Sequence, residues 1–317
     1  MDGAGDIKPL DPKKFRDPDV TASGETRARV ALKSLETLWI NTGTLCNLAC
    51  ENCYIESSPR NDRLAYITYE EVRAYLDEIA ELKLGTGEIA FTGGEPFMNP
   101  EIIRMLEEVL RRGHRALVLT NAMRPMRRHD SVLKKLRYRF DGLLILRVSV
   151  DHYTQAVHEK ERGPDSWQPM LDGLKFLSDG KFVTHVAGRT LSGEDEASMR
   201  DGFRTLFTEQ GISIDADDPA ALTLFPEMDM RQDVPEITDK CWSILGVDPD
   251  DIMCASSRMV VKRKGADRPA VVACTLLPYD AEFELGATLG EAETEVALNH
   301  PHCAKFCVLG GGACSGD

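Results

Sequence analysis

Three cysteines with the spacing C-x3-C-x2-C, namely Cys46, Cys50 and Cys53, are the residues best suited to chemistry in this sequence. Three thiolates this close can bind three irons on one face of an iron–sulfur cube, which leaves the fourth iron without a protein ligand. A structural zinc site is closed by four protein ligands, and ordinary electron-transfer clusters are held by four cysteines. The motif therefore predicts a cluster with one position open to a ligand that is not protein. A zinc knuckle or a group of reduced thiols is the alternative.

A second motif, Gly93-Gly94-Glu95-Pro96, follows a short apolar run at residues 88–91. Glycine lets another backbone approach closely, and carbonyl groups at the end of a strand can bind an ammonium group together with the Glu95 carboxylate. An ordinary turn is the alternative interpretation. Because the cysteine motif lies upstream, we expect the glycines to take part in the same site.

Polar residues also end two later apolar runs. Thr120-Asn121 ends the run at residues 115–120, and Ser149-Val150-Asp151 ends the run at residues 143–150. A hydroxyl and a carboxylate two residues apart on a strand lie on one face, so Ser149 and Asp151 can contact the same ligand. A simple Ser/Asp cap is the alternative.

Alternating strands and helices must position these residues. We expect strands at residues 35–40, 88–91, 115–120, 143–150, 182–190 and 221–225. We expect helices after the capping box Thr68-Tyr69-Glu70-Glu71, after an N-cap at Asn99 with Pro100 in the first helical position, and at residues 131–140, 169–178 and 197–209. Strands that alternate with helices predict a parallel sheet, in which reactive groups gather at the carboxyl ends of the strands.

The cysteine motif, the strand before it and Gly93-Gly94-Glu95-Pro96 resemble the signature of the radical S-adenosylmethionine (radical SAM) superfamily. The resemblance implies an α/β fold, a partial (β/α)6 TIM-like barrel, which agrees with six predicted strand–helix units. It implies that Cys46, Cys50 and Cys53 bind a [4Fe–4S] cluster whose open iron chelates S-adenosylmethionine (SAM). An electron from a flavodoxin- or ferredoxin-type donor then drives SAM cleavage, and the 5′-deoxyadenosyl radical takes a hydrogen atom from the substrate.

The resemblance extends to the residues around SAM. The cofactor-binding candidates that it implies are Gly93, Gly94, Glu95, Thr120, Asn121, Ser149, Asp151, Arg162 and Tyr54. Arg162 resembles an arginine that approaches the SAM carboxylate, and Arg189, at the end of the fifth strand, is a catalytic candidate facing the same cavity. A solvated surface position is the alternative for both arginines. The position before the third cysteine is usually aromatic in the family, but here it is Asn52, which puts the local adenine contact in doubt.

Six further cysteines follow residue 240: Cys241, Cys254, Cys274, Cys303, Cys307 and Cys314. The segments at residues 257–265 and 270–273 read as a hairpin with a cysteine at each end, which resembles the SPASM and twitch extensions of radical SAM enzymes. The resemblance implies one auxiliary [4Fe–4S] cluster, because six cysteines are too few for two clusters with four cysteines each. The favoured ligands are Cys254, Cys274, Cys303 and Cys307, with Cys314 as the reserve.

Other roles for the late cysteines stay open. A zinc site formed by Cys303 and Cys307 with His300 or His302 is an alternative to the auxiliary cluster. Cys241, beside Trp242, is either a buried apolar residue or a catalytic candidate that donates a hydrogen atom to a substrate radical.

Composition limits the partners and the surroundings. The 317 residues contain 52 acidic and 38 basic side chains, for a net charge of −14, which argues against nucleic acid or an anionic membrane as partner. Nine cysteines without a signal peptide predict a reducing cytoplasm and metal sites rather than disulfides. We predict an N-terminal arm at residues 1–34, partly disordered or lying as a strap, a barrel at residues 35–230 and an auxiliary cluster domain at residues 231–317.

The substrate is less well defined by the sequence. Peptide-modifying relatives commonly carry a separate leader-binding domain, and the N-terminal arm is too short to be one, which favours a small molecule or a free-standing peptide as the substrate. The twitch-like arrangement predicts a two-electron oxidation in which the auxiliary cluster accepts an electron. Alternatives are a maturase that modifies a ribosomal peptide or protein, a radical epimerase, and an iron–sulfur sensor or scaffold without turnover. Glu227, His152, His158 and Asp229 are candidates for a catalytic acid or base, and the sequence does not rank them.

Overall fold

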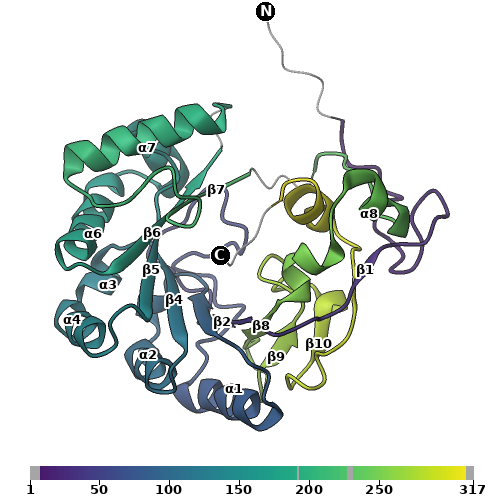
Figure 1. Ribbon diagram of the computed structural model, residues 1–317, viewed down its shortest axis with the longest axis horizontal. Coiled ribbons are helices and arrows are strands. Elements are labelled where there is room, and N and C mark those ends of the chain that lie inside the picture. The colour runs from purple at the N-terminus through teal and green to yellow at the C-terminus, as the bar shows by residue number, and fades with distance from the viewer. Residues whose placement is uncertain (1–7, 191–192, 227–230, 312–317) are drawn as a thin grey trace, which may run out of the picture.

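A curved, open sheet forms the centre of the molecule. The computed structural model describes residues 8–190, 193–226 and 231–311 (Figure 1). Its main sheet has nine strands in the order β10-β9-β8-β2-β3-β4-β5-β6-β7. The six strands of the predicted barrel are β2 (Thr37–Asn41), β3 (Glu88–Thr92), β4 (Arg115–Thr120), β5 (Leu144–Ser149), β6 (Val183–Arg189) and β7 (Leu222–Phe225). Neighbours among these six pair in parallel and the sheet does not close, so the predicted α/β partial barrel is confirmed.

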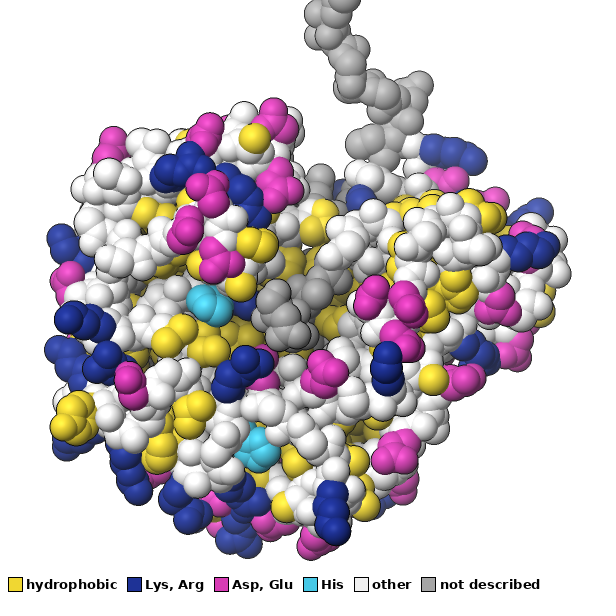
Figure 2. Space-filling view, in the orientation of Figure 1, with side chains coloured by type: hydrophobic (Ala, Val, Ile, Leu, Met, Phe, Trp, Pro, Cys, Tyr) yellow, Lys and Arg dark blue, Asp and Glu magenta, His cyan; other side chains and the backbone are white. Residues whose placement is uncertain are grey.

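Helices cover the outer face of this sheet (Figure 1). They are α1 (Tyr69–Leu82), α2 (Ile102–Arg111), α3 (Arg124–Arg127), α4 (Asp130–Arg139), α5 (Gln155–Arg162), α6 (Trp167–Asp179) and α7 (Glu196–Gln210), with the short turn η1 (Pro96–Met98) before α2. Lys and Arg side chains gather over α2 and α4 on the solvent side (Figure 2). None of the helices in the described ranges has the length and apolar character needed to cross a membrane.

Side chains alternate between the two faces of each strand, and this alternation divides the core. Leu38 and Ile40 of β2 pack outward against the helices in one large cluster. Trp39 lies between them and faces inward, where it packs with Ala90 of β3 and Leu117 of β4. Successive side chains on a strand point to opposite faces of the sheet, so every second residue of these strands faces the interior of the barrel.

The start of α1 is as predicted from the sequence, but the start of α2 is not. Thr68 Oγ1 accepts a hydrogen bond from the Glu71 N–H at 3.3 Å, and Glu71 Oε2 accepts one from the Thr68 N–H at 2.9 Å, so the predicted capping box is present. The prediction that Asn99 caps α2 is wrong, because α2 begins at Ile102 after Glu101. Asn99 Oδ1 accepts a hydrogen bond from the Glu101 N–H at 2.9 Å, ahead of the first residue of α2. Its Nδ2 donates to the carbonyls of Thr42 and Ile67, at 3.1 and 2.9 Å, and so ties the β3–α2 connection to neighbouring loops.

The predicted hairpin extends the main sheet beyond β2. β8 (Ser257–Val261) pairs in parallel with β2, and β9 (Ala270–Val272) pairs antiparallel with β8. The remaining elements of this part are α8 (Asp239–Leu245), η2 (Pro249–Asp251), η3 (Met253–Ala255), η4 (Ala281–Phe283), β10 (Glu284–Gly286), β11 (Val296–Ala297) and the π-helix η5 (Cys303–Val308). They enclose a second apolar cluster around Phe306 and Ile252. Residues 227–230 lie outside the described residues, so the boundary near residue 230 stays a prediction.

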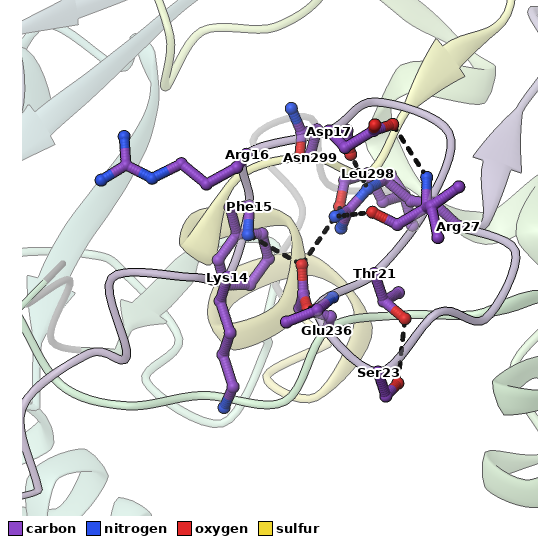
Figure 3. A network of polar contacts seen from close by, with 12 residues as sticks. Lys14, Phe15, Arg16, Asp17, Thr21, Ser23, Arg27, Glu236, Leu298 and Asn299 are labelled. Carbon is purple, nitrogen blue, oxygen red and sulfur yellow. Dashed lines mark hydrogen bonds and ion pairs between the residues drawn. The ribbon is translucent and has the colours of Figure 1, made fainter.

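The N-terminal segment from residue 8 lies along the C-terminal part of the chain (Figure 1). Its strand β1 (Arg29–Val30) pairs with β11. The fully buried Arg27 donates to Glu236 Oε1 at 2.6 Å and to the carbonyl of Leu298 at 3.3 Å, and the Phe15 N–H donates to the same Glu236 oxygen (Figure 3). A buried ion pair therefore holds the described part of the N-terminal arm in place.

Candidate functional site

The cavity at the carboxyl ends of the barrel strands brings most of the predicted site residues together. The predicted residues that line it are Cys46, Cys50, Cys53, Tyr54, Gly93, Gly94, Thr120, Asn121, Ser149, Asp151, Arg162 and Arg189. These residues come from β2, β3, β4, β5, β6 and the segments that follow them, as expected for a parallel sheet. The structure places one predicted residue, Glu95, beside the cavity rather than on its wall.

The cysteine loop is held against the end of β3 by the two glycines. The Gly94 N–H donates to the Gly43 carbonyl at 2.8 Å, and the Glu95 N–H donates to the Leu45 carbonyl at 3.2 Å. A Cβ atom at Gly94 would lie 2.2 Å from the Leu45 carbonyl oxygen. Gly93 has φ = +132°, and a Cβ there would lie 2.5 Å from the Gly43 carbonyl oxygen. Only glycine fits at both positions, and their packing fixes the peptide that leads into Cys46.

Glu95 organises the strand ends from behind the cavity wall. Its carboxylate accepts hydrogen bonds from Thr120 Oγ1 at 2.9 and 3.0 Å, from the Asn121 N–H at 2.8 Å and from the Phe97 N–H at 3.1 Å. Burial raises the pKa of Glu95 to about 7, although these hydrogen bonds oppose the shift. Asn121 in turn donates to Asn47 Oδ1 at 3.0 Å, so this network connects β3, β4 and the cysteine loop.

Asp151 and Arg162 form an ion pair on the cavity wall. Arg162 Nε lies 2.8 Å from Asp151 Oδ2, and Arg162 Nη2 donates to Asp151 Oδ1 at 3.1 Å. Their side chains are 3% and 14% exposed. Burial alone would raise the pKa of Asp151, but the Arg162 guanidinium holds it below its ordinary value. Arg162 is therefore a partly buried cation next to Cys50, not the solvated surface residue of the alternative interpretation.

Replacing Asp151 by asparagine is expected to lower the free energy of unfolding of the apoprotein by about 3 kcal/mol, because Arg162 loses its counter-charge in a buried position. Urea unfolding measures this change. The matched control is Asp130→Asn, which breaks the more exposed ion pair of Asp130 with Arg127 and is expected to cost less than about 1 kcal/mol. Equal losses in the two variants would contradict the prediction.

The residue at the unusual position, Asn52, is bound to α5. Its Nδ2 donates to Glu161 Oε2 at 2.8 Å, and the neighbouring Glu51 N–H donates to the Glu161 carbonyl at 2.8 Å. Arg189 Nη1 donates to the Asn52 carbonyl at 3.2 Å and lies 3.7 Å from Glu161 Oε2. Glu161 thus joins the cysteine loop to β6. Sequence analysis missed it, and only the departure at Asn52 signalled that the loop is supported differently here.

The donor set in the first cysteine loop fits a [4Fe–4S] cluster. Burial raises the pKa of Cys46 to about 12, so a free thiolate is unfavourable there, whereas bound iron displaces the thiol proton. The Leu48 N–H donates to Cys46 Sγ at 3.4 Å and the Ser57 N–H to Cys53 Sγ at 3.3 Å, as suits sulfurs that carry negative charge. No three His, Cys, Asp or Glu side chains of the described chain surround a single ion. A [4Fe–4S] cluster does not require three side chains around a single ion, because each cysteine thiolate binds a different iron.

The second set of cysteines lies in the C-terminal part. Cys254 and Cys303 belong to the second apolar cluster, and Cys274 and Cys307 pack against it. Burial raises the pKa of Cys303 well above its ordinary value. Cys303 and Cys307 both lie in the π-helix η5, a type of turn common at functional sites. Within the described ranges, no group of three side chains surrounds one ion as the zinc alternative with His300 or His302 requires.

Cys241, a catalytic candidate, is not brought to the cavity. Cys241 lies in α8, where its Sγ accepts a hydrogen bond from the Thr238 N–H at 3.4 Å, and it packs against the second apolar cluster. Glu227 and Cys314 lie outside the described residues. Sequence analysis also missed apolar lining residues from distant segments: Trp39, Leu119, Phe225, Leu276 and Phe306.

Comparisons with known proteins agree with this geometry. The model of the radical SAM superfamily matches residues 40–201. The antilisterial bacteriocin subtilosin biosynthesis protein AlbA of Bacillus subtilis is 31% identical over 143 residues, which are 45% of this chain and 30% of AlbA. The AdoMet-dependent heme synthase of Nitratidesulfovibrio vulgaris is 24% identical over 160 residues, which are 50% of this chain and 41% of that protein. The chain therefore spans less than half the length of these two relatives.

Solved structures share the fold. Streptococcus suis SuiB bound to S-adenosylmethionine superposes with a TM-score of 0.59 at 11% identity, over 80% of this chain and 64% of SuiB. The enzyme anSMEcpe with bound AdoMet also has a TM-score of 0.59, at 16% identity, over 85% of this chain and 82% of that one. Radical SAM proteins bind a [4Fe–4S] cluster and SAM, and the cysteine loop described above fits both. Because the family match spans more than half of the 317 residues, the chain belongs to the radical SAM superfamily.

Proposed function

We propose that this enzyme carries out a two-electron oxidation of its substrate, with a second [4Fe–4S] cluster held by Cys254, Cys274, Cys303 and Cys307. One observation carries the proposal: a single cavity extends from the first cysteine loop to residues that flank the second cysteine set. Thr275 and Leu276 follow Cys274 directly. A substrate in this cavity is therefore adjacent to both cysteine sets.

The chemistry that the bound groups supply is hydrogen-atom abstraction by the 5′-deoxyadenosyl radical, after which the substrate loses a proton and passes one electron to the auxiliary cluster. The chain itself positions and encloses the reactants. Asp151 and Arg162 present paired charges that orient the polar end of SAM, and the glycines at the end of β3 hold the cysteine loop against the cavity. Phe225 and Phe306, whose rings stack at 5.9 Å, belong with Trp39 to the apolar wall that excludes water from the substrate.

We propose a small molecule as the substrate and a flavodoxin- or ferredoxin-type protein as the electron donor. The second candidate function is modification of a peptide. It is favoured by the similarity to AlbA, a bacteriocin biosynthesis protein, and by the structure of SuiB bound to precursor peptide SuiA, which superposes with a TM-score of 0.59. The apolar wall around Phe225 and Phe306 accommodates an apolar side chain equally well.

The test is product analysis with the anaerobically reconstituted enzyme, SAM and reduced flavodoxin. A small-molecule extract is one probe, and a synthetic peptide encoded beside the gene is the other. We expect one 5′-deoxyadenosine for each product that has lost two hydrogens. The control Cys254→Ser/Cys274→Ser is expected to form 5′-deoxyadenosine without the oxidised product. An isomer at unchanged redox state that contains solvent deuterium would establish an epimerase instead, and no 5′-deoxyadenosine with both clusters loaded would support a sensor.

A further inference from the structure

Arg258 is a buried cation without a carboxylate partner. It lies in β8, is 1% exposed and has all its described contacts with backbone carbonyls. Its Nε donates to Ala292 at 3.0 Å, Nη1 donates to Cys254 at 2.5 Å and to Ser257 at 2.8 Å, and Nη2 donates to Thr294 at 3.0 Å. Among the described residues, no Asp or Glu forms an ion pair with it.

Arg27, a second buried arginine, has a carboxylate counter-charge. Arg27 is also 1% exposed, and its Nη2 lies 2.6 Å from Glu236 Oε1 in the network of Figure 3. A buried charge without a counter-charge is strongly destabilising, even where hydrogen bonds satisfy each N–H group. Arg258 therefore needs a negatively charged partner, and no carboxylate among the described residues provides one.

The groups available to balance Arg258 are the cysteines of the second set. Arg258 donates to the carbonyl of Cys254. β8 pairs antiparallel with β9, with Met259 opposite Val272, so Cys274, two residues after Val272, follows β9 at the end that lies beside Arg258. A [4Fe–4S] cluster with four thiolate ligands carries net negative charge, and one more unit when it is reduced. A cation next to two of its ligands therefore fits this site in both states and stabilises the reduced state more.

We propose that Arg258 is the counter-charge of the auxiliary cluster and raises its reduction potential, so that it accepts the electron from the substrate. This inference rests on the proposed function, because it assumes a cluster on the second cysteine set. Charge and hydrogen bonding near the ligands are established determinants of cluster potentials. Arg258 acts through the cluster and makes no contact with the substrate cavity, so it is a positioning residue rather than a catalytic one.

The experiment uses the full chain with Cys46, Cys50 and Cys53 replaced by alanine, so that only the auxiliary cluster contributes to the spectrum. Redox titration monitored by electron paramagnetic resonance compares Arg258, Arg258→Gln and Arg258→Lys. Arg258→Gln is expected to lower the midpoint potential by at least 59 mV, a tenfold change for one electron. Arg258→Lys keeps the charge, so its midpoint potential is expected to differ from that of the parent by less than 59 mV. Its thermal stability is expected to be lower, because the guanidinium hydrogen bonds are lost.

The matched control is Arg27→Gln, which removes a second buried arginine and is expected to lower stability without moving the potential. The proposal is overturned if Arg258→Gln binds a full cluster at unchanged potential. Arg258→Lys tests the proposal if Arg258→Gln does not fold. A full cluster in Arg258→Lys with a midpoint potential at least 59 mV below that of the parent would also overturn the proposal. Absence of iron from the parent variant would instead contradict the proposed second cluster, so the two failures are distinguishable.

Discussion

Replacing Cys46, Cys50 and Cys53 together by alanine is expected to lower the bound iron from about eight to about four atoms per chain and to abolish 5′-deoxyadenosine formation. The three thiols line one cavity and are the only protein ligands proposed for the first cluster. Anaerobic iron and sulfide analysis after reconstitution measures the first effect, and chromatography of the SAM cleavage products measures the second.

The reciprocal variant provides the control. Alanine at Cys254, Cys274 and Cys303 is expected to remove about four irons as well, but to leave SAM cleavage by dithionite-reduced enzyme intact. The two triple variants thus lose the same amount of iron and differ in chemistry. If the Cys46/Cys50/Cys53→Ala variant kept no iron at all while remaining folded, the arrangement with two separate clusters would be wrong.

Gly94→Ala is expected to reduce both iron in the first cluster and SAM cleavage by at least about tenfold. The added Cβ would lie 2.2 Å from the Leu45 carbonyl oxygen, a backbone atom that cannot rotate away. The cysteine loop must therefore shift relative to β3, and a displacement of about 1 Å at a catalytic site can cost about a hundredfold in rate. Iron analysis of the variant, with circular dichroism to establish that it is folded, measures the effect.

Gly87→Ala is the matched control for this substitution. Gly87 lies just before β3, has no positive φ, and no atom lies within 4 Å of a Cβ built there. It is expected to match the wild-type iron content and SAM cleavage, so any loss in Gly94→Ala reports the contact with Leu45 and not glycine replacement in general. Full iron content in Gly94→Ala would show that the loop adjusts without loss of its ligand geometry.

The barrel was predictable because its signals are local. Apolar runs, glycines at strand ends and the capping box at Thr68 each act within a few residues, and all were identified from the sequence. Asn99 was assigned wrongly as the N-cap because α2 begins two residues later than a cap at Asn99 requires. Its Oδ1 accepts from the Glu101 N–H just ahead of α2, and its Nδ2 is bound by two distant carbonyls, those of Thr42 and Ile67. A tertiary contact of this kind leaves no periodic pattern in the sequence.

The site was predictable at its motif residues and less so at its walls. Cys46, Gly94 and Asp151 occur in recognisable patterns, and the structure brings them to one cavity. Phe225 of β7 and Phe306 of η5 are far apart in the sequence, so nothing local distinguishes them from ordinary core residues. Arg258 is similar: its sequence position suggests a strand residue in a hairpin, and only its burial among carbonyls reveals an unbalanced charge.

The parallel pairing of β8 with β2 has a mechanical consequence. Cys46 follows the end of β2 by five residues, and Cys254 precedes the start of β8 by three, so the hydrogen-bonded ladder between β2 and β8 ties together the strands that border the two cysteine sets. Such a ladder resists stretching and leaves no hinge between the sets along this path. Electron tunnelling falls steeply with distance, and a rigid ladder keeps that distance constant through each turnover. For the proposed second cluster, the sheet that lines the cavity therefore also fixes its distance from the first cluster.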